Sequence, residues 1–319
     1  MKNLLKLLPI IAALAPQFLQ AQSWPQRPVK LVLPFAAGGN TDSQARILSP
    51  RLSAAFRQQF IVENRVGAGG AIAAEYVAKS PADGYTLFFT AVPQISILPL
   101  VQKVNYDSLT DFAPISIFGT NPFVLGVNAS LPARNLKEFI DYVRAHPGRI
   151  NYSSGGTGSV GHLTPALFAS RAGLKMTHIP YKGGAPAVAD LVGGQVQVYF
   201  GNPSELIPHA KSGKIFLLAV SSEKRAPQLP ELPAIAELYP GFNIVTWNGM
   251  LAPAGTPKEI IDGLAQEMIK TTRDPAVVEQ LNKIGIDPLG NTPAEFAEFI
   301  RNEAPLWRDA VNAAGIKQE

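Results

Sequence analysis

Apolar runs of strand length alternate with amphipathic stretches of helix length along most of this chain. The run Val29–Leu33 precedes a helical stretch over 42–60, and a second run at 60–63 precedes another over 70–79. Val29–Leu33 is almost entirely apolar, as is typical of a strand buried on both faces. A third run, 85–90, leads into a loop with prolines. This alternation predicts parallel β-α-β units.

The same alternation returns further along the chain and predicts a second set of elements. Strands are expected over 123–127, 149–152, 176–180, 196–200, 216–220 and 243–251. Helices are expected over 136–145, 160–172, 185–193 and 206–212. Three closing helices are expected over 257–272, 275–284 and 293–314, and each begins near a proline, which suits a first helical turn.

The first 21 residues have the pattern of a signal peptide. Lys2 and Lys6 give a positive start, Leu4–Ala15 is apolar, and Ala21 or Ser23 offers a small residue for cleavage. The pattern predicts export and removal of this segment. An exported chain without cysteine has no disulfide framework, so its stability must come from packing.

The chain that remains predicts two α/β lobes, because its roughly 295 residues exceed the usual size of one hydrophobic core. We expect one lobe to comprise 24–122 and 252–319, and the other to comprise 123–251. Crossing strands near Phe123 and Trp247 are expected to join them.

The charge of the chain indicates which kind of partner it binds. The formal net charge is +4, and loss of Lys2 and Lys6 leaves 26 basic against 24 acidic residues. No basic block is present, which argues against a nucleic-acid partner, and mild basicity is compatible with an anionic ligand.

Two glycine-rich turns are the candidate binding elements. The first turn, Pro34–Asp42, and the second turn, Ser153–His162, each run from an apolar strand into a helix. Glycine allows successive N–H groups to converge, and a helix N-terminus adds partial positive charge, so each turn is a potential anion cradle. Two cradles in one chain predict one acidic ligand held between two lobes.

The second turn also contains a dinucleotide-type spacing, Gly156-Thr-Gly158-Ser-Val-Gly161. That fingerprint expects an acidic residue after the next strand, but Met176–Pro180 leads to Tyr181 and Lys182 instead. The glycines are therefore interpreted as a smaller anion nest, and no cofactor is expected.

Hydrolytic chemistry is the competing hypothesis. Ser159, close to His162, could make the chain an exported serine hydrolase that acts on a small acidic or ester substrate. Thr157 stands where a nucleophile elbow needs glycine, however. His162 has two possible roles, a local hydrogen bond within the turn or a contact to the ligand. Asp42 could likewise be a helix N-terminal residue or a ligand contact.

Metal chemistry is not expected. Apart from His162, the histidines are His146, His178 and His209, and their spacing is not that of a metal site. The absence of cysteine also argues against a zinc centre.

Several segments together resemble one family over essentially the whole mature chain. They are Trp24–Lys30, the first turn, Val62–Gly70, Ala78–Leu87, Asn151–Ser159, His178–Ala187, Gly193–Val198 and Trp247–Pro257. In order and spacing they are similar to the tripartite tricarboxylate transporter receptors, also called the Bug family of periplasmic solute-binding proteins.

The resemblance implies a two-lobed, flytrap-like periplasmic binding protein of type II, in which each lobe is a mostly parallel sheet flanked by helices. It implies a protein without catalysis that delivers a small organic acid to the integral membrane subunits of a transporter. From the two glycine-rich turns we expect the protein to bind this acid as a monomer. Carried over by position, it implies ligand contacts at Phe35, Gly39, Asn40, Thr41, Asp42, Thr157, Gly158, Ser159, His162, Tyr181, Lys182, Gly183, Gly184, Ala185 and Asn202.

Two departures from the family pattern bear on the ligand. Many relatives carry an aspartate where this chain has Gly201, so a ligand with an amino group is less favoured. The segment Thr90–Ser96 is more apolar than in relatives. It could accept an aliphatic or aromatic ligand body, or it could simply pack as a loop.

Overall fold

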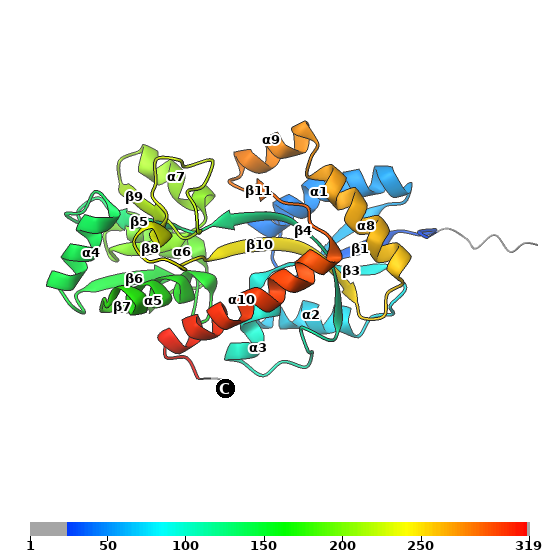
Figure 1. Ribbon diagram of the computed structural model, residues 1–319, viewed down its shortest axis with the longest axis horizontal. Helices are drawn as coiled ribbons and strands as arrows, with labels where there is room; N and C mark the ends of the chain where they lie inside the picture. The colour runs from blue at the N-terminus through cyan, green and yellow to red at the C-terminus, as the bar shows by residue number, and fades with distance from the viewer. Residues whose placement is uncertain (1–23, 318–319) are drawn as a thin grey trace, which may run out of the picture.

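Two β-sheets flanked by helices form two lobes that lie side by side along the long axis of the molecule (Figure 1). The computed structural model describes residues 24–317, so the expected signal peptide lies outside the described residues. None of the helices in this described part is long and apolar enough to span a membrane.

The first lobe is built on a six-stranded sheet in the order β11-β4-β10-β3-β1-β2. Its strands are β1 (Val29–Leu33), β2 (Phe60–Asn64), β3 (Thr86–Ala91), β4 (Phe112–Pro122), β10 (Val245–Pro253) and β11 (Asp287–Pro288). Its helices are α1 (Asn40–Phe56), α2 (Ala71–Ala78), α3 (Leu98–Val101), α8 (Lys258–Thr271) and α9 (Pro275–Lys283), with short turns η1 (Ala68–Gly70) and η2 (Pro93–Ile97).

The second lobe is built on a five-stranded sheet in the order β7-β6-β8-β5-β9. Its strands are β5 (Val124–Asn128), β6 (Ile150–Ser154), β7 (Met176–Pro180), β8 (Val198–Gly201) and β9 (Ile215–Val220). Its helices are α4 (Leu136–Ala145), α5 (Val160–Ala172), α6 (Gly184–Gly193) and α7 (Pro203–Lys211), followed by the turn η3 (Ile235–Glu237).

Strand direction confirms the expected β-α-β units and shows one or two reversed strands in each sheet. β1 is parallel to β2 and β3, and β6 is parallel to β7 and β8. In the first sheet β1, β2, β3 and β4 run in one direction, and in the second sheet β6, β7, β8 and β9 do so, so each sheet is mostly parallel. Both sheets are mixed, because β10 is antiparallel to β3 and β4, and β5 is antiparallel to β8 and β9. In each sheet the strand that enters from the other lobe runs against the β-α-β strands.

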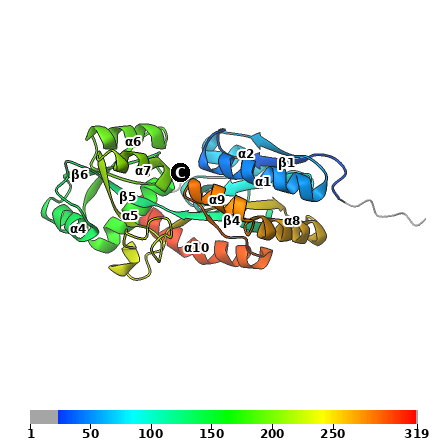
Figure 2. The same cartoon turned by 90° about the horizontal axis from the view of Figure 1, so that it is seen from above.

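The two lobes are connected by β4 and β10, which extend between them (Figures 1 and 2). β4 passes into β5 through Phe123, and β10 pairs with β4 from Val245 opposite Pro122 to Pro253 opposite Phe112. The expected return to the first lobe at residue 252 therefore falls inside β10.

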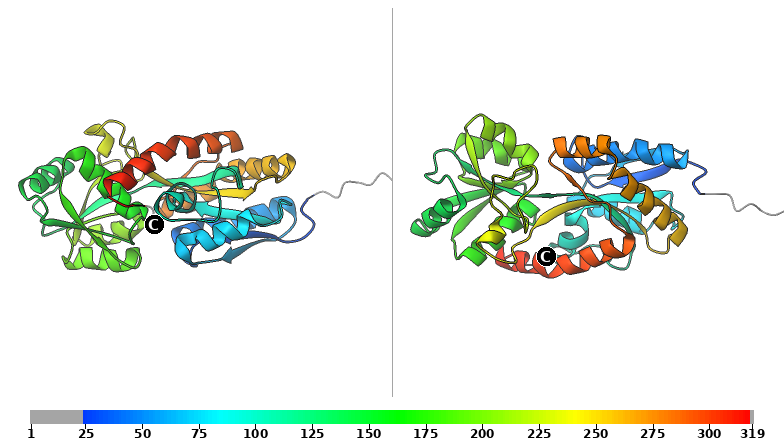
Figure 3. Two further views of the ribbon diagram at one scale, coloured as in Figure 1. Left: turned by 90° about the horizontal axis from the view of Figure 1, so that it is seen from below. Right: turned by 45° about the horizontal axis from the view of Figure 1, so that its top comes forward.

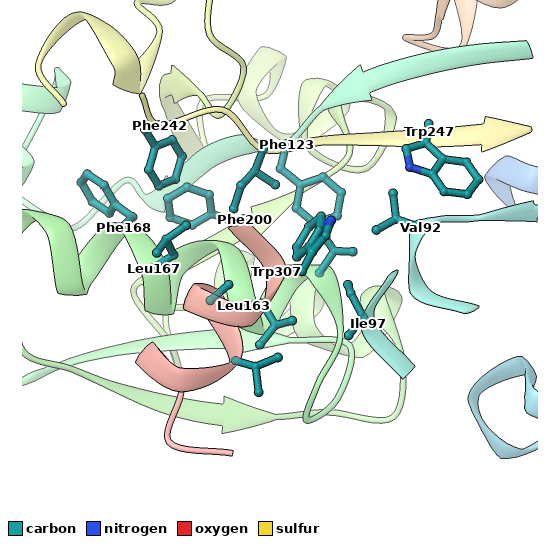
Figure 4. Packing of buried hydrophobic residues seen from close by; sticks show 14 of the residues in the cluster. Val92, Ile97, Phe123, Leu163, Leu167, Phe168, Phe200, Phe242, Trp247 and Trp307 are labelled. Atoms are coloured by element: carbon teal, nitrogen blue, oxygen red, sulfur yellow. The ribbon is translucent and has the colours of Figure 1, made fainter. Parts of the chain in front are cut away.

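The last helix, α10 (Pro293–Ala313), lies along both lobes (Figure 3). A capping box between Thr292 and Glu295 fixes its start, and Pro293 occupies its first position. The helix packs on β4 in the first lobe and on α5 in the second. Its Trp307 is fully buried in the hydrophobic cluster with Phe123, Phe200 and Leu163 (Figure 4). The apolar packing is thus continuous from one lobe to the other.

Candidate functional site

A cavity of about 470 Å³ lies between the lobes and is lined by both. From the first lobe and its crossing strands it is lined by Phe35, Gly39, Asn40, Thr41, Ala91, Pro93, Phe123, Thr246 and Asn248. From the second lobe it is lined by Gly155, Ser159, Val160, Gly161, Gly183, Gly184, Tyr199, Asn202 and Glu205. The two glycine-rich turns therefore meet at one cavity, as the sequence predicts.

Three helices begin at this cavity without a side-chain cap. Gly39, Ser159 and Gly183 precede the first residues of α1, α5 and α6, and none of the three helices has a side-chain hydrogen bond at its N-cap. The first N–H groups of a helix have no intrahelical partner and carry partial positive charge. The lining contains no lysine or arginine. The four hydroxyls of the lining, on Thr41, Ser159, Tyr199 and Thr246, donate to protein acceptors. Backbone N–H groups are thus the main groups available here for holding an anion.

The Asp42 carboxylate stabilises the first turn through hydrogen bonds within the first lobe. Its buried carboxylate accepts hydrogen bonds from Arg46 Nε at 2.8 Å, Gly38 N at 2.9 Å and Asn64 Nδ2 at 3.0 Å. The hydrogen bond from Arg46 is the main reason that the pKa of Asp42 falls to about 2. Asn64 also donates to the Phe35 carbonyl at 2.9 Å, which fixes the start of the turn. Of the two interpretations of Asp42, the geometry favours the structural one.

Amide side chains link the two lobes beside the cavity. Asn121 on β4 donates to Asn202 Oδ1 at 2.8 Å and accepts from Asn40 Nδ2 at 3.4 Å. Thr41 donates to Asn248 Oδ1 on β10 at 2.6 Å. The first turn, the crossing strands and α7 are therefore held in one polar network.

Two stacked histidines support the second turn. His162 Nδ1 accepts from Gly158 N at 3.1 Å, and the ring lies 3.6 Å from that of His178, nearly parallel to it. His178 Nε2 is 2.7 Å from Ser154 Oγ. Burial lowers the pKa of both histidines to about 4, so both rings are neutral near pH 7. Of the two interpretations of His162, a local hydrogen bond or a ligand contact, the structure shows the local hydrogen bond.

Ser159 and His162 do not form a nucleophile and base. Ser159 Oγ donates to the Gly156 carbonyl at 2.7 Å, and the Nδ1 atom of His162 is occupied by Gly158. Within residues 24–317 no hydrogen bond joins the Ser159 hydroxyl to a histidine. The hydrolase alternative is not supported by this geometry.

The expected contact residues divide into two groups. Those that line the cavity are Phe35, Gly39, Asn40, Thr41, Ser159, Gly183, Gly184 and Asn202. Those outside the lining are Asp42, Thr157, Gly158, His162, Tyr181, Lys182 and Ala185. Among these, the Tyr181 hydroxyl donates to Asp190, and Thr157, Lys182 and Ala185 are exposed.

Sequence reasoning missed several residues of the lining, above all Tyr199, Glu205, Thr246 and Asn248. Glu205 follows Asn202 by three residues and closes a capping box at the start of α7, a spacing that could have revealed it. Alternate residues of a strand share a face, which could have revealed Thr246 and Asn248 together. Of the segment 90–96, Ala91 and Pro93 line the cavity, while Val92 and Ile95 belong to the core.

Known proteins of similar sequence and structure identify the family of this chain. Residues 44–316 match the sequence model described as tripartite tricarboxylate transporter family receptor. Protein BugT of Bordetella pertussis is 37% identical over 300 residues, which cover 93% of this chain and 92% of that protein.

Two solved structures with ligands have the same fold. The R. palustris protein Rpa4515 with adipate has a TM-score of 0.83 at 37% identity, covering 93% of this chain and 100% of that one. MatC (Rpa3494) from Rhodopseudomonas palustris with bound malate has a TM-score of 0.77 at 30% identity, covering 90% of this chain and 100% of that one. The chain therefore belongs to the tripartite tricarboxylate transporter receptor family of solute-binding proteins, and the resemblance first noted in its sequence is confirmed.

Proposed function

We propose that this protein captures a small organic acid in the cavity between its lobes and delivers it, in the periplasm, to the integral membrane subunits of a tripartite tricarboxylate-type transporter. The observation that carries the proposal is the convergence of three uncapped helix N-termini, from both lobes, on one cavity whose lining lacks lysine and arginine. Such a site binds an anion through fixed backbone dipoles.

Family membership supports the same ligand class. Two relatives at 30% identity or more hold adipate and malate, both of them carboxylates, in their solved structures. The periplasmic location and the transporter partner are what the family membership implies. A monomer that binds without turning its ligand over is the simplest form of this function.

The proposed contacts follow from the lining. Asn40, Thr41 and Ser159 line the cavity beside free helix N-termini, whose backbone N–H groups are the proposed donors. The Thr41 and Ser159 hydroxyls already donate to Asn248 Oδ1 and to the Gly156 carbonyl, so their role is to fix the two turns. Gly183, Gly184 and Asn202 complete the second-lobe wall. Asp42 and His162 act indirectly, because each holds a turn in place.

A thermal-shift screen of mono-, di- and tricarboxylates tests the function. A ligand that binds only the folded state stabilises it by about 2.7 kcal/mol at one hundred times its Kd, so the Tm should rise with an organic acid. Calorimetry on the acids that raise the Tm then gives the affinity. A screen in which neutral sugars or free metal ions shift the Tm while no carboxylate does would contradict the proposal.

A further inference from the structure

We propose that Glu205 makes this cavity selective for a ligand that carries a carboxylate at one end and an ammonium group at the other. The inference rests on the proposed function, since it specifies the class of organic acid. In this arrangement the helix N-termini of the two turns hold the ligand's carboxylate, and Glu205 binds its ammonium group.

Glu205 lies in the cavity with one carboxylate oxygen available. Its Oε2 atom accepts from Asn202 N at 3.0 Å and from the Tyr199 hydroxyl at 3.1 Å. Among residues 24–317, no donor is recorded within hydrogen-bonding distance of its Oε1 atom. The cap of α7 thus accounts for one oxygen and leaves the other free for a ligand.

The charge of Glu205 has no side-chain counter-ion. Its carboxylate forms no ion pair with any lysine, arginine or histidine of the described chain, and the cavity lining contains no lysine or arginine. A ligand ammonium group would supply the missing positive charge. A second ligand carboxylate near Glu205 would instead meet a like charge in a partly buried site, where repulsion is poorly screened.

Two glycines make room for this carboxylate. A Cβ at position 201 would lie 2.7 Å from Glu205 Oε2 and closer still to the Tyr199 ring. A Cβ at position 184 would lie 2.9 Å from Glu205 Oε1 and 3.0 Å from the Tyr199 hydroxyl. Gly201 was expected to disfavour an amino group because it removes an acidic side chain. That expectation overlooked Glu205, whose carboxylate occupies the space beside Gly201.

Tyr199 keeps the carboxylate in place. The Tyr199 side chain is buried, and burial raises the pKa of its hydroxyl above the usual value, so the hydroxyl stays protonated and donates to Glu205. Glu205 is therefore held by two donors and needs little rearrangement to bind a ligand.

Pairs of acids with equal carbon number test the proposal. Calorimetry compares adipate with ε-aminocaproate, and succinate with γ-aminobutyrate, while caproate serves as the acid without a second polar group. In the wild type we expect the amino acid of at least one pair to bind more tightly than its matched diacid. If the cavity accepts the six-carbon acids, ε-aminocaproate should also bind more tightly than caproate.

Glu205→Gln removes the charge but keeps an amide oxygen that can cap α7. It should weaken binding of the preferred amino acid by about tenfold or more, as expected for loss of a charged hydrogen bond, and should improve binding of the matched diacid. Glu295→Gln is the matched control, because Glu295 closes the same kind of capping box on α10 and lies outside the cavity lining. It should leave both affinities unchanged.

The outcomes separate this inference from the proposed function. Tighter binding of the diacid in both pairs, or a ranking that Glu205→Gln leaves unchanged, would overturn the role of Glu205 while the receptor function stands. Failure of every carboxylate to bind would overturn both.

Discussion

His162 and His178 stack on each other beside the second turn, and the hydrogen bond that supports the turn requires His162 to be neutral. His162 can accept from Gly158 N only while its Nδ1 atom is unprotonated. Protonation would remove this acceptor and place two positive charges on rings 3.6 Å apart. The pair therefore makes the shape of the anion cradle depend on pH.

This dependence has a definite direction. The folded state lowers the pKa of each histidine from 6.5 to about 4, so the unfolded chain takes up protons first as the pH falls. The stability contributed by the pair is present above pH 6.5 and is lost as the pH falls towards 4. Urea unfolding across this range should show less steep pH dependence in His178→Gln than in the wild type. His146→Gln, outside the stacked pair, should keep the wild-type slope; an equal slope in His178→Gln would refute the account.

Glu303 on α10 has the opposite dependence. It accepts from Trp247 Nε1 at 3.0 Å and from the Ser96 hydroxyl, and burial raises its pKa from 4.5 to about 7. A raised pKa means that the folded state holds the proton more tightly, so this contribution to stability is present below pH 4.5 and is lost as the pH rises through 7. Urea unfolding of the wild type and of Glu303→Gln measures this contribution. As the pH rises from 4.5 through 7, the free energy of unfolding of the wild type should fall relative to that of Glu303→Gln. A difference between the two proteins that stays constant with pH would contradict this account of Glu303.

At the scale of the elements, local pattern explains much of the fold and long-range pairing explains the errors. The apolar run of β1 and the prolines at the starts of α9 and α10 could be read directly from the sequence. The antiparallel β5 and β10 could not, because their direction depends on partners in distant parts of the chain. The segment expected as a proline-containing loop instead forms η2 and α3.

The candidate site was predictable to a similar extent. Glycine-rich strand-to-helix turns have a local signature, so both cradles were found. Local sequence could not show that Asp42 and His162 lie outside the cavity lining and support the turns, since that depends on Asn64, Arg46 and His178. Tertiary contacts decide which polar residue of a turn contacts a ligand and which one supports the turn.

The second turn depends on the backbone at Gly158. Its φ of +77° is in the left-handed region, so Gly158→Val should cost about 1–2 kcal/mol of stability and distort the cradle. Ser159→Ala removes one hydroxyl and should have the smaller effect on affinity. Gly148→Val is the matched control, because Gly148 has a φ of +75° and nothing within 4 Å of its Cβ position. It should lose stability but keep affinity in calorimetry. Equal, negligible effects of both turn variants on affinity would show that the second turn does not hold the ligand.

At the scale of the whole molecule, the two lobes are joined by strands, by polar contacts and by a shared core. β4 and β10 form the covalent connections, and Asn121 bridges Asn40 and Asn202 beside the cavity. α10 packs on both lobes and carries Trp307 into their common cluster. We expect any opening of the cavity to bend the chain near Phe123 and Trp247, where β4 and β10 connect the lobes.

Capture of an acid between the lobes is the central claim, and solution scattering tests it most directly. A ligand that contacts both lobes favours the closed state through those contacts, so the ligand-free protein should be more open. With an acid from the screen at saturation, confirmed by calorimetry, the radius of gyration should fall. An unchanged scattering profile at confirmed saturation would contradict closure of the lobes around the ligand.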